Sequence, residues 1–144
     1  MNSVLEFLQA LEKAYRDLCS PLCRDLGFTQ TAFDILMFLG NNPSRKTARD
    51  IVEIRRLKAN LVSVNVDRLV RDGYLIRRSA PGDRRKVELE CTSKAQPVIL
   101  RGRELQRRFH DLLFKDVSEK EKADFNAVLN TMASSLNHIS EEIQ

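Results

Sequence analysis

The sequence predicts a mainly α-helical fold with one small β-hairpin. Apolar residues recur at spacings of three and four over long stretches at both ends of the chain, which is the pattern of amphipathic helices. A Pro-Gly turn at 81–82 precedes a short stretch that alternates between apolar and polar residues, as a strand does. With 144 residues, of which 42% are hydrophobic, the chain suits a single domain with one core.

The first predicted helix begins at Val4. Its apolar stripe consists of Val4, Leu8, Leu11, Tyr15, Leu18 and Leu22. Because proline lacks the amide donor and clashes with the preceding turn, we expect a kink or a restart at Ser20 and Pro21. Gly27 follows as a C-terminal cap.

Two shorter helices come next. The second helix is predicted over Gln30–Leu39, with Thr29 as its N-cap and Gly40 at its end. The third begins after Thr47, whose hydroxyl forms an acidic variant of the capping box with Asp50, and it ends near residue 55.

The stretch from Asn60 to Asp72 fits two structures. Val62, Val64 and Val66 alternate with polar residues, as in a strand. The same stretch also has a helical apolar face, formed by Val62, Val66, Leu69 and Val70. Charged residues cover the opposite face and Gly73 stands where a helix would end, so we predict a helix.

A hairpin and two long helices complete the chain. The hairpin strands are predicted at residues 74–78 and 87–91, with the tip at Pro81 to Arg85. The following helix starts near Pro97, and its apolar seam is Val98, Gly102, Leu105, Phe109 and Leu112. The last helix begins at a capping box formed by Ser118 and Glu121. Its seam is Phe125, Val128, Met132, Leu136, Ile139 and Ile143.

This order of elements predicts a winged helix-turn-helix flanked by N- and C-terminal helices. In a helix-turn-helix the second helix lies in the major groove of DNA, and here that helix covers residues 58–71. The hairpin carries Arg84, Arg85 and Lys86, which suit the DNA backbone or the negative potential of the minor groove.

The charge distribution points to the same class of partner. Residues 45–86 hold 13 Lys or Arg against 5 Asp or Glu, a net +8, whereas the rest of the chain carries −4. A cationic block of this kind favours a polyanion, because each neutralised phosphate releases condensed counterions. Double-stranded DNA is the expected partner. A solvated, self-repelling surface is the alternative that charge alone leaves open.

Other functions are not indicated. The two histidines, His110 and His138, are far apart, and the three cysteines form no disulfide framework, so we expect no metal, no cofactor and no enzyme activity. The longest apolar run, Ile35–Leu39, is too short to cross a bilayer, and the N-terminus lacks a basic signal-like start. We therefore expect a cytoplasmic protein with no membrane partner.

Three groups of residues match the motifs of one protein family. The first is Thr29, Gln30, Phe33 and Leu36 in the second predicted helix. The second, in the helix-turn-helix, is Ile51-Val52-Glu53, Asp67-Arg68-Leu69 and Gly73-Tyr74-Leu75. The third, in the wing, is Asp83-Arg84-Arg85 followed by Val87, Leu89 and Thr92. In these motifs the chain resembles the MarR (multiple antibiotic resistance regulator) family of winged-helix transcription regulators.

The resemblance implies one domain over residues 1–144, with a winged-helix lobe at 29–94 and dimerisation helices at 1–26 and 95–144. It implies a homodimer that acts at a pseudo-palindromic operator as a repressor released by a ligand or a modification. Asp83 would hold the guanidinium of Arg85 in the minor groove, with Arg84 as the secondary candidate. On the recognition helix, Lys58, Asn60 and Ser63 are the expected groove contacts, Asn60 because its amide can pair with adenine.

The sequence departs from the family pattern at five positions, one of which is Pro97, early in the helix after the wing. Val64 replaces a basic or polar residue that reads bases, and Lys58 is a poor N-cap. Asn65 stands where an apolar core residue is usual, and Arg56 replaces the glycine of the turn. Val64 and Lys58 motivate an alternative function, a helical dimer for protein interaction with weak or lost DNA readout.

Two regulatory features remain open. Cys19 and Cys23 share a helix face and either sense oxidants, as thiols do in some branches of the family, or pack in the core. Cys91 takes the family's inward leucine position. Four side chains with aromatic rings either line a small-molecule effector pocket or belong to the core. They are Phe7, Tyr15, Phe109 and His110.

Overall fold

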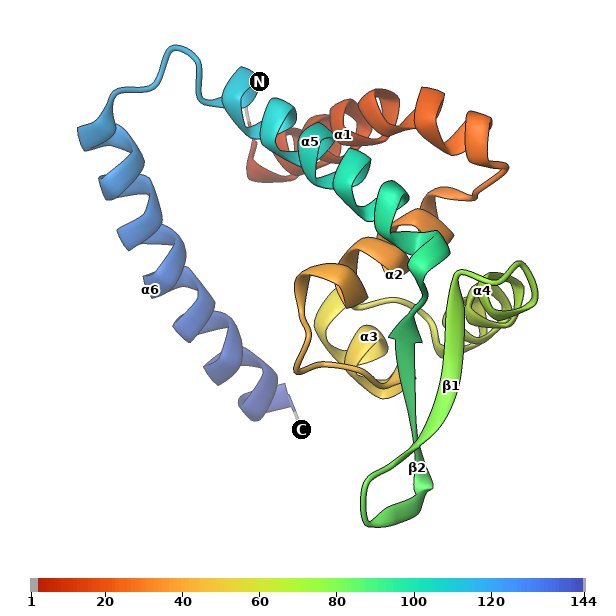
Figure 1. The fold of residues 1–144 in the computed structure, drawn as a ribbon. Helices are drawn as coiled ribbons and strands as arrows, with labels where there is room; N and C mark the ends of the chain where they lie inside the picture. Colours follow the sequence, from red (N-terminus) through yellow and green to blue (C-terminus); the bar gives the residue numbers. More distant parts are fainter. Residues whose placement is uncertain (1–2, 144) are drawn as a thin grey trace. The chain divides into compact units, whose positions relative to one another are not determined.

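The computed structural model describes residues 3–143, which form two compact units that divide after Arg107 (Figure 1). The first unit contains α1 (Val4–Leu26), α2 (Gln30–Asn41), α3 (Ala48–Arg55), α4 (Ala59–Arg71), β1 (Leu75–Ala80) and β2 (Asp83–Cys91). A 3-10 turn (Ser93–Ala95) leads into α5 (Gln96–Leu113), which crosses the boundary, and the second unit contains α6 (Glu119–Ile143). This is the predicted order of helices and hairpin.

The core of the first unit is built around α2, which packs against α1, α4 and β2. Every residue of α2 from Ala32 to Leu39 is buried except Asp34, because neighbouring elements surround this helix on all sides. The largest fully buried side chains include Phe33, Leu36, Ile51 and Leu75. The winged-helix elements therefore share one core.

The capping residues predicted from sequence form the expected bonds. The Thr29 hydroxyl accepts from the Ala32 amide at 3.0 Å, and Thr47 and Asp50 bond each other's backbone amides in a full capping box. Gly27 adopts the left-handed conformation after α1, with φ of 65°. These local signals set the first three helices.

Of the two expectations at Pro21, the restart is wrong, because the first helix is continuous from Val4 to Leu26. Proline removes one backbone bond there, but its helical neighbours Cys19, Leu22 and Cys23 are buried in the core and hold the backbone helical. Similarly, α2 does not end at Gly40.

Gly40 lies inside α2 because a side chain from α5 covers it. A Cβ at Gly40 would stand 2.9 Å from Ile99 Cγ2, so the glycine allows α2 and α5 to approach closely. The helix ends at Asn41, and the side-chain amide of Asn42 donates to the Phe38 carbonyl at 2.8 Å. A glycine that resembles a cap in the sequence is here a packing residue.

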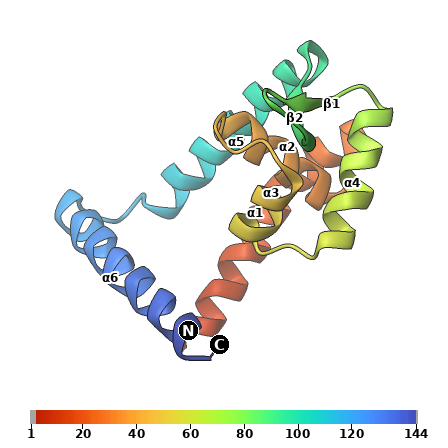
Figure 2. The ribbon, with the colours of Figure 1, turned by 90° about the horizontal axis from the view of Figure 1, so that it is seen from below.

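The stretch 60–72 is helical, as predicted, and the strand alternative is excluded. Val62, Val66 and Leu69 of α4 are buried, together with Asn65, so one helical face packs on the core. In both views α4 lies beside β1, with which it makes contact (Figures 1 and 2). This pairing places the exposed face of α4 and the hairpin in the same lobe.

The hairpin is longer than predicted and has an irregular end. Its antiparallel register runs from Leu75 opposite Cys91 to Ser79 opposite Val87, and then shifts so that Ala80 pairs with Asp83. The turn is thus confined to residues 81–82 instead of the predicted 81–85. The shift leaves residues 84–86 without partners on β1.

The second unit is amphipathic but has no core of its own. No described residue of α6 is buried, and its apolar seam is exposed, with Leu136 at 61% and Ile143 at 80%. The capping box at its start forms as predicted, with Ser118 and Glu121 bonding each other's amides at 2.8 and 3.2 Å. No helix in residues 3–143 is long and apolar enough to span a membrane.

Candidate nucleic-acid interface

The predicted contact residues on α4 lie on its exposed side. Lys58 is the N-cap of the helix and, as predicted, its side chain forms no capping hydrogen bond. Asn60 and Ser63 follow on the first turns and are exposed. The amides of the first turn therefore remain available at a helix end that carries a partial positive charge.

The buried amide of Asn65 fixes how α4 meets α2. Its Oδ1 accepts a hydrogen bond from the Thr29 hydroxyl at 2.7 Å, and its Nδ2 donates to the Leu61 carbonyl at 2.8 Å. Thr29 is also the N-cap of α2. Asparagine is accepted in this apolar position because both of its polar atoms are satisfied.

Arg56 lies in the turn that connects α3 to α4. Its φ of 55° makes it the only non-glycine residue with positive φ in the described part of the chain. This conformation normally favours glycine, so the arginine is held there at an energetic cost. Its side chain is exposed and forms no ion pair within residues 3–143.

The hairpin presents its three consecutive cations, Arg84, Arg85 and Lys86, at the register shift. All three are exposed and lie where β2 has no partner on β1. Asp83 Oδ1 accepts a hydrogen bond from the backbone amide of Arg85 at 3.0 Å. The resemblance placed this carboxylate on the guanidinium of Arg85. Here it accepts from the backbone amide instead, and Arg85 forms no ion pair within residues 3–143.

The base of the hairpin is tied to the helices on two sides. The Leu89 amide donates to the Lys46 carbonyl at 2.7 Å, which joins β2 to the loop before α3. The Thr92 hydroxyl bonds the Gly73 carbonyl at 2.6 Å, just after α4. The Lys94 ammonium bonds the Asp72 carbonyl and lies 4.4 Å from the ring centroid of Tyr74. These bonds fix the hairpin relative to α4.

Ion pairing divides the cationic block into two groups. Six of its basic residues are paired with carboxylates: Arg45, Arg49, Arg55, Arg68, Arg77 and Arg78. Seven form no ion pair within residues 3–143: Lys46, Arg56, Lys58, Arg71, Arg84, Arg85 and Lys86. The unpaired group includes Lys46, Arg56 and Arg71, which sequence reasoning did not select. An unpaired exposed cation is available to a phosphate without first breaking an ion pair.

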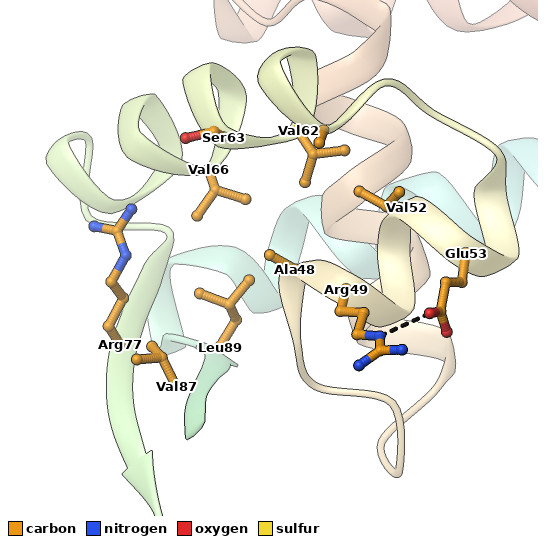
Figure 3. A pocket seen from close by; sticks show the side chains of 11 residues that line it. Ala48, Arg49, Val52, Glu53, Val62, Ser63, Val66, Arg77, Val87 and Leu89 are labelled. Carbon is orange, nitrogen blue, oxygen red and sulfur yellow. Dashed lines mark hydrogen bonds and ion pairs between the residues drawn. The ribbon is translucent and has the colours of Figure 1, made fainter. Parts of the chain in front are cut away.

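A cavity of about 490 Å³ lies between α3, α4 and the hairpin (Figure 3). Its walls are mainly apolar, and they include Val52, Val62, Val66, Val87 and Leu89. The figure shows charged side chains of α3 and β1 beside these walls, where Arg49 bonds Glu53 at 2.7 Å. A small apolar molecule in this space would contact both the predicted recognition helix and the wing.

The predicted effector residues are distributed over the two units. Phe7 and Tyr15 belong to the first, where the Tyr15 hydroxyl accepts from Gln106 Nε2 at 3.1 Å. Phe109 and His110 belong to the second, where the His110 ring lies 4.7 Å from that of Phe114. The cavity described above lies within the winged lobe and is lined by none of the four.

The predicted redox cysteines are buried in the core. Cys19 is 0% exposed and Cys23 is 6% exposed. Burial raises the pKa of Cys23 to about 11 and also raises the pKa of Cys19. Because the thiolate is the reactive form, this environment favours the packing interpretation. Cys91 is partly buried and packs against the core, as predicted.

Together the fold and the exposed cations define a winged helix-turn-helix protein. The sequence profile described as MarR family matches residues 26–86, which include the hairpin cations. This match covers the winged-helix region, where the sequence motifs resemble the same family. No curated protein matches the chain significantly.

Solved structures share the fold of the whole chain at low sequence identity. The transcriptional regulator PA3341 has a TM-score of 0.84 and 21% identity, covering 94% of this chain and 99% of its own. A putative MarR-family regulator from Listeria monocytogenes, complexed with 26mer DNA, has a TM-score of 0.83 and 15% identity, covering 94% and 90%. The S. aureus MepR–DNA complex has a TM-score of 0.80 and 17% identity, covering 93% and 96%.

Proposed function

We propose that this protein is a MarR-family transcription regulator that binds double-stranded DNA sequence-specifically, as a homodimer at a pseudo-palindromic operator, and acts as a ligand-responsive repressor in the cytoplasm. The observation that carries the proposal is the group of seven unpaired cations around α4 and the hairpin. Two relatives of the same fold are described in complex with DNA, which supports the same partner here.

The roles follow from the geometry of the lobe. The exposed side of α4 enters the major groove, with Lys58, Asn60 and Ser63 facing bases and phosphates. Arg84, Arg85 and Lys86 reach the backbone or the minor groove from the unpaired part of β2. The bonds at the base of the hairpin hold these two elements in one orientation, so that they bind one stretch of duplex together.

The first test is substitution of a single wing cation. Arg85→Ala should weaken binding to a selected duplex and lower the salt dependence of log K by about 0.9 for each phosphate that is no longer neutralised. Arg101→Ala is the matched control, because it removes the same charge from α5, where Arg101 faces Asp25 at 3.9 Å. Unchanged affinity and slope in Arg85→Ala, measured by salt titration, would remove Arg85 from the interface.

The competing function is a protein-interaction dimer that has lost DNA readout. It is favoured by the apolar side chains of Leu61 and Val64, which are 41% and 66% exposed on the proposed recognition helix. Selection from a pool of random duplexes separates the two functions. Enrichment of a palindrome supports the regulator, whereas recovery of unbiased sequences supports the interaction dimer.

The ligand response centres on the cavity between α3, α4 and the hairpin. An occupant would contact the recognition helix through Ser63 and the wing through Val87. It would thereby change how the two DNA-contacting elements sit together. The relevant measurement is whether small apolar molecules that raise the melting temperature also change the affinity for the selected duplex.

A further inference from the structure

The outward stripe of α4 contains an apolar residue at its centre. Asn60, Val64, Asp67 and Arg71 are spaced by four, three and four residues and thus follow one face of the helix. All four are exposed, and Val64 is exposed by 66%. Leu61, three residues before Val64, is exposed by 41%. The valines of the opposite face, Val62 and Val66, are buried.

Packing within the lobe therefore does not explain Val64 and Leu61. Val64 and Leu61 are exposed on a helix whose buried face is already apolar, so they gain little from folding and are free to contact a partner. The partner must also suit the surroundings of this patch. Lys58 lies at the start of the same helix and Arg71 at its end, and both lack an ion pair within residues 3–143.

Charge complementarity selects DNA as the occupant. The acidic member of the stripe, Asp67, is paired with Arg77 of β1, so it does not oppose an anionic partner. A surface with phosphate-binding cations around an apolar centre fits a major groove, where phosphates flank the base edges. The apolar group that base edges present in this groove is the C5-methyl of thymine.

We propose that Val64, assisted by Leu61, recognises thymine methyl groups in the major groove of each half-site. The inference rests on the proposed function and specifies the sequence class that it reads. Asn60 precedes Val64 by one helical turn, about 6 Å, which corresponds to roughly two base-pair steps. If Asn60 pairs with adenine, the half-site carries an adenine and a contacted thymine within about two base pairs of each other.

The test removes the methyl group of thymine in one arm and the methyl groups of Val64 in the other. A duplex selected from a random pool by the full-length protein is resynthesised with uracil replacing one thymine at a time. Uracil keeps the base pair and lacks only the methyl. We expect at least one position per half-site where uracil weakens binding by about fourfold, the value for one buried methylene-sized group.

Val64→Ala should weaken binding to the thymine duplex by a similar factor and should no longer distinguish thymine from uracil at that position. Ile54→Val is the matched control, since Ile54 is 49% exposed on α3, outside the stripe, and also loses one methylene-sized group. It should keep the full discrimination. Because Val64 is exposed, its alanine variant should retain the wild-type circular dichroism and melting temperature.

Each outcome decides one of the two proposals. If a palindrome is enriched but no thymine is sensitive to uracil, the methyl contact is refuted and the regulator stands. The methyl contact by Val64 is also refuted if Val64→Ala remains as sensitive as the wild type, because another residue would then read the methyl. If no duplex is enriched, the proposed function itself fails, and Val64 and Leu61 belong to a protein interface.

Discussion

Arg56 shows how a single residue can store strain beside a functional element. Its positive φ lets the chain turn sharply from α3 into α4, a geometry that glycine adopts without cost. The arginine contributes an unpaired cation beside the start of the proposed recognition helix. We infer that the charge is useful to binding at the expense of stability.

Replacing Arg56 with glycine should therefore stabilise the fold. We expect the free energy of unfolding of Arg56→Gly to exceed that of Arg56→Ala by about 1 kcal/mol. This difference is the cost of a left-handed backbone for alanine, reduced by the larger conformational entropy of glycine in the unfolded chain. The alanine variant is the control, because both remove the same charge. Urea unfolding measures the difference, and an alanine variant equal to or above the glycine variant would show that the turn is unstrained. Both variants should bind DNA more weakly than the wild type.

The buried cysteines give a prediction about pH. Burial raises the pKa of Cys23 from 9.0 to about 11, so in this window the thiol ionises in the unfolded chain before it does in the folded one. The contribution of the buried, neutral Cys23 thiol to the free energy of unfolding is complete below pH 9 and is lost as the pH rises towards 11. The free energy of unfolding should fall across this range, and Cys23→Ala should reduce the slope. If the free energy of unfolding falls equally steeply with pH in Cys23→Ala and in the wild type, groups other than Cys23 cause the fall.

At the scale of elements, α2 and α5 cross at two glycines. Ile99 of α5 covers Gly40 of α2, and Met37 of α2 covers Gly102 of α5. Each glycine accommodates a large side chain of the other helix, so the helices approach closely and bury Ile99 and Met37. This crossing anchors α5 on the winged lobe.

Adding one methyl group at this crossing should be destabilising. A Cβ at residue 102 would collide with the Met37 side chain and approach Phe33 Cζ to 3.2 Å. We expect Gly102→Ala to lower the free energy of unfolding by about 1–3 kcal/mol, the usual cost of overpacking. Glu104→Ala, at an exposed position on the same helix, is the control and should be near neutral. Thermal and urea unfolding measure both; a stable Gly102→Ala would mean that Met37 moves aside freely.

At the scale of the whole molecule, the long helices leave extensive apolar surface exposed. On α1 the side chains of Val4, Leu5 and Leu8 are at least half exposed, and on α6 the same holds for Val128, Leu136 and Ile139. An amphipathic helix without a buried residue does not account for its own stability, so α6 requires a partner surface. The proposed homodimer supplies one.

Sedimentation equilibrium should therefore find a dimer. Leu136→Glu should raise the dissociation constant by about a hundredfold or more, since the burial of two leucines, one from each protomer, is lost. Asn130→Glu adds the same charge away from the apolar seam of α6 and should leave the dimer intact. A monomeric wild type, or equal effects of both variants, would contradict dimerisation through this seam.

Local signals were sufficient for most of the fold. The capping residues Thr29, Thr47 and Ser118 form the bonds predicted from their spacing, because a cap depends on residues three positions apart. The helical nature of α4 followed from its apolar face. For the site, the sequence indicated the exposed cations of the wing and the exposed polar residues of α4, whose DNA contacts stay predictions.

The remaining features depend on contacts between residues far apart in the chain. Pro21 stays within a helix because the core holds its neighbours, and Gly40 extends a helix because Ile99 covers it. Likewise, Arg55 is neutralised by Asp34 and Arg78 by Glu90, whereas Arg56 and Arg85 remain unpaired. The sequence shows that residues 45–86 are rich in basic residues. Which of these form ion pairs depends on the carboxylates that the tertiary structure places beside them. Apolar periodicity and helix capping depend on residues a few positions apart, so the sequence determines them. Helix packing and ion pairing depend on residues that are distant in the chain, so only the tertiary structure determines them.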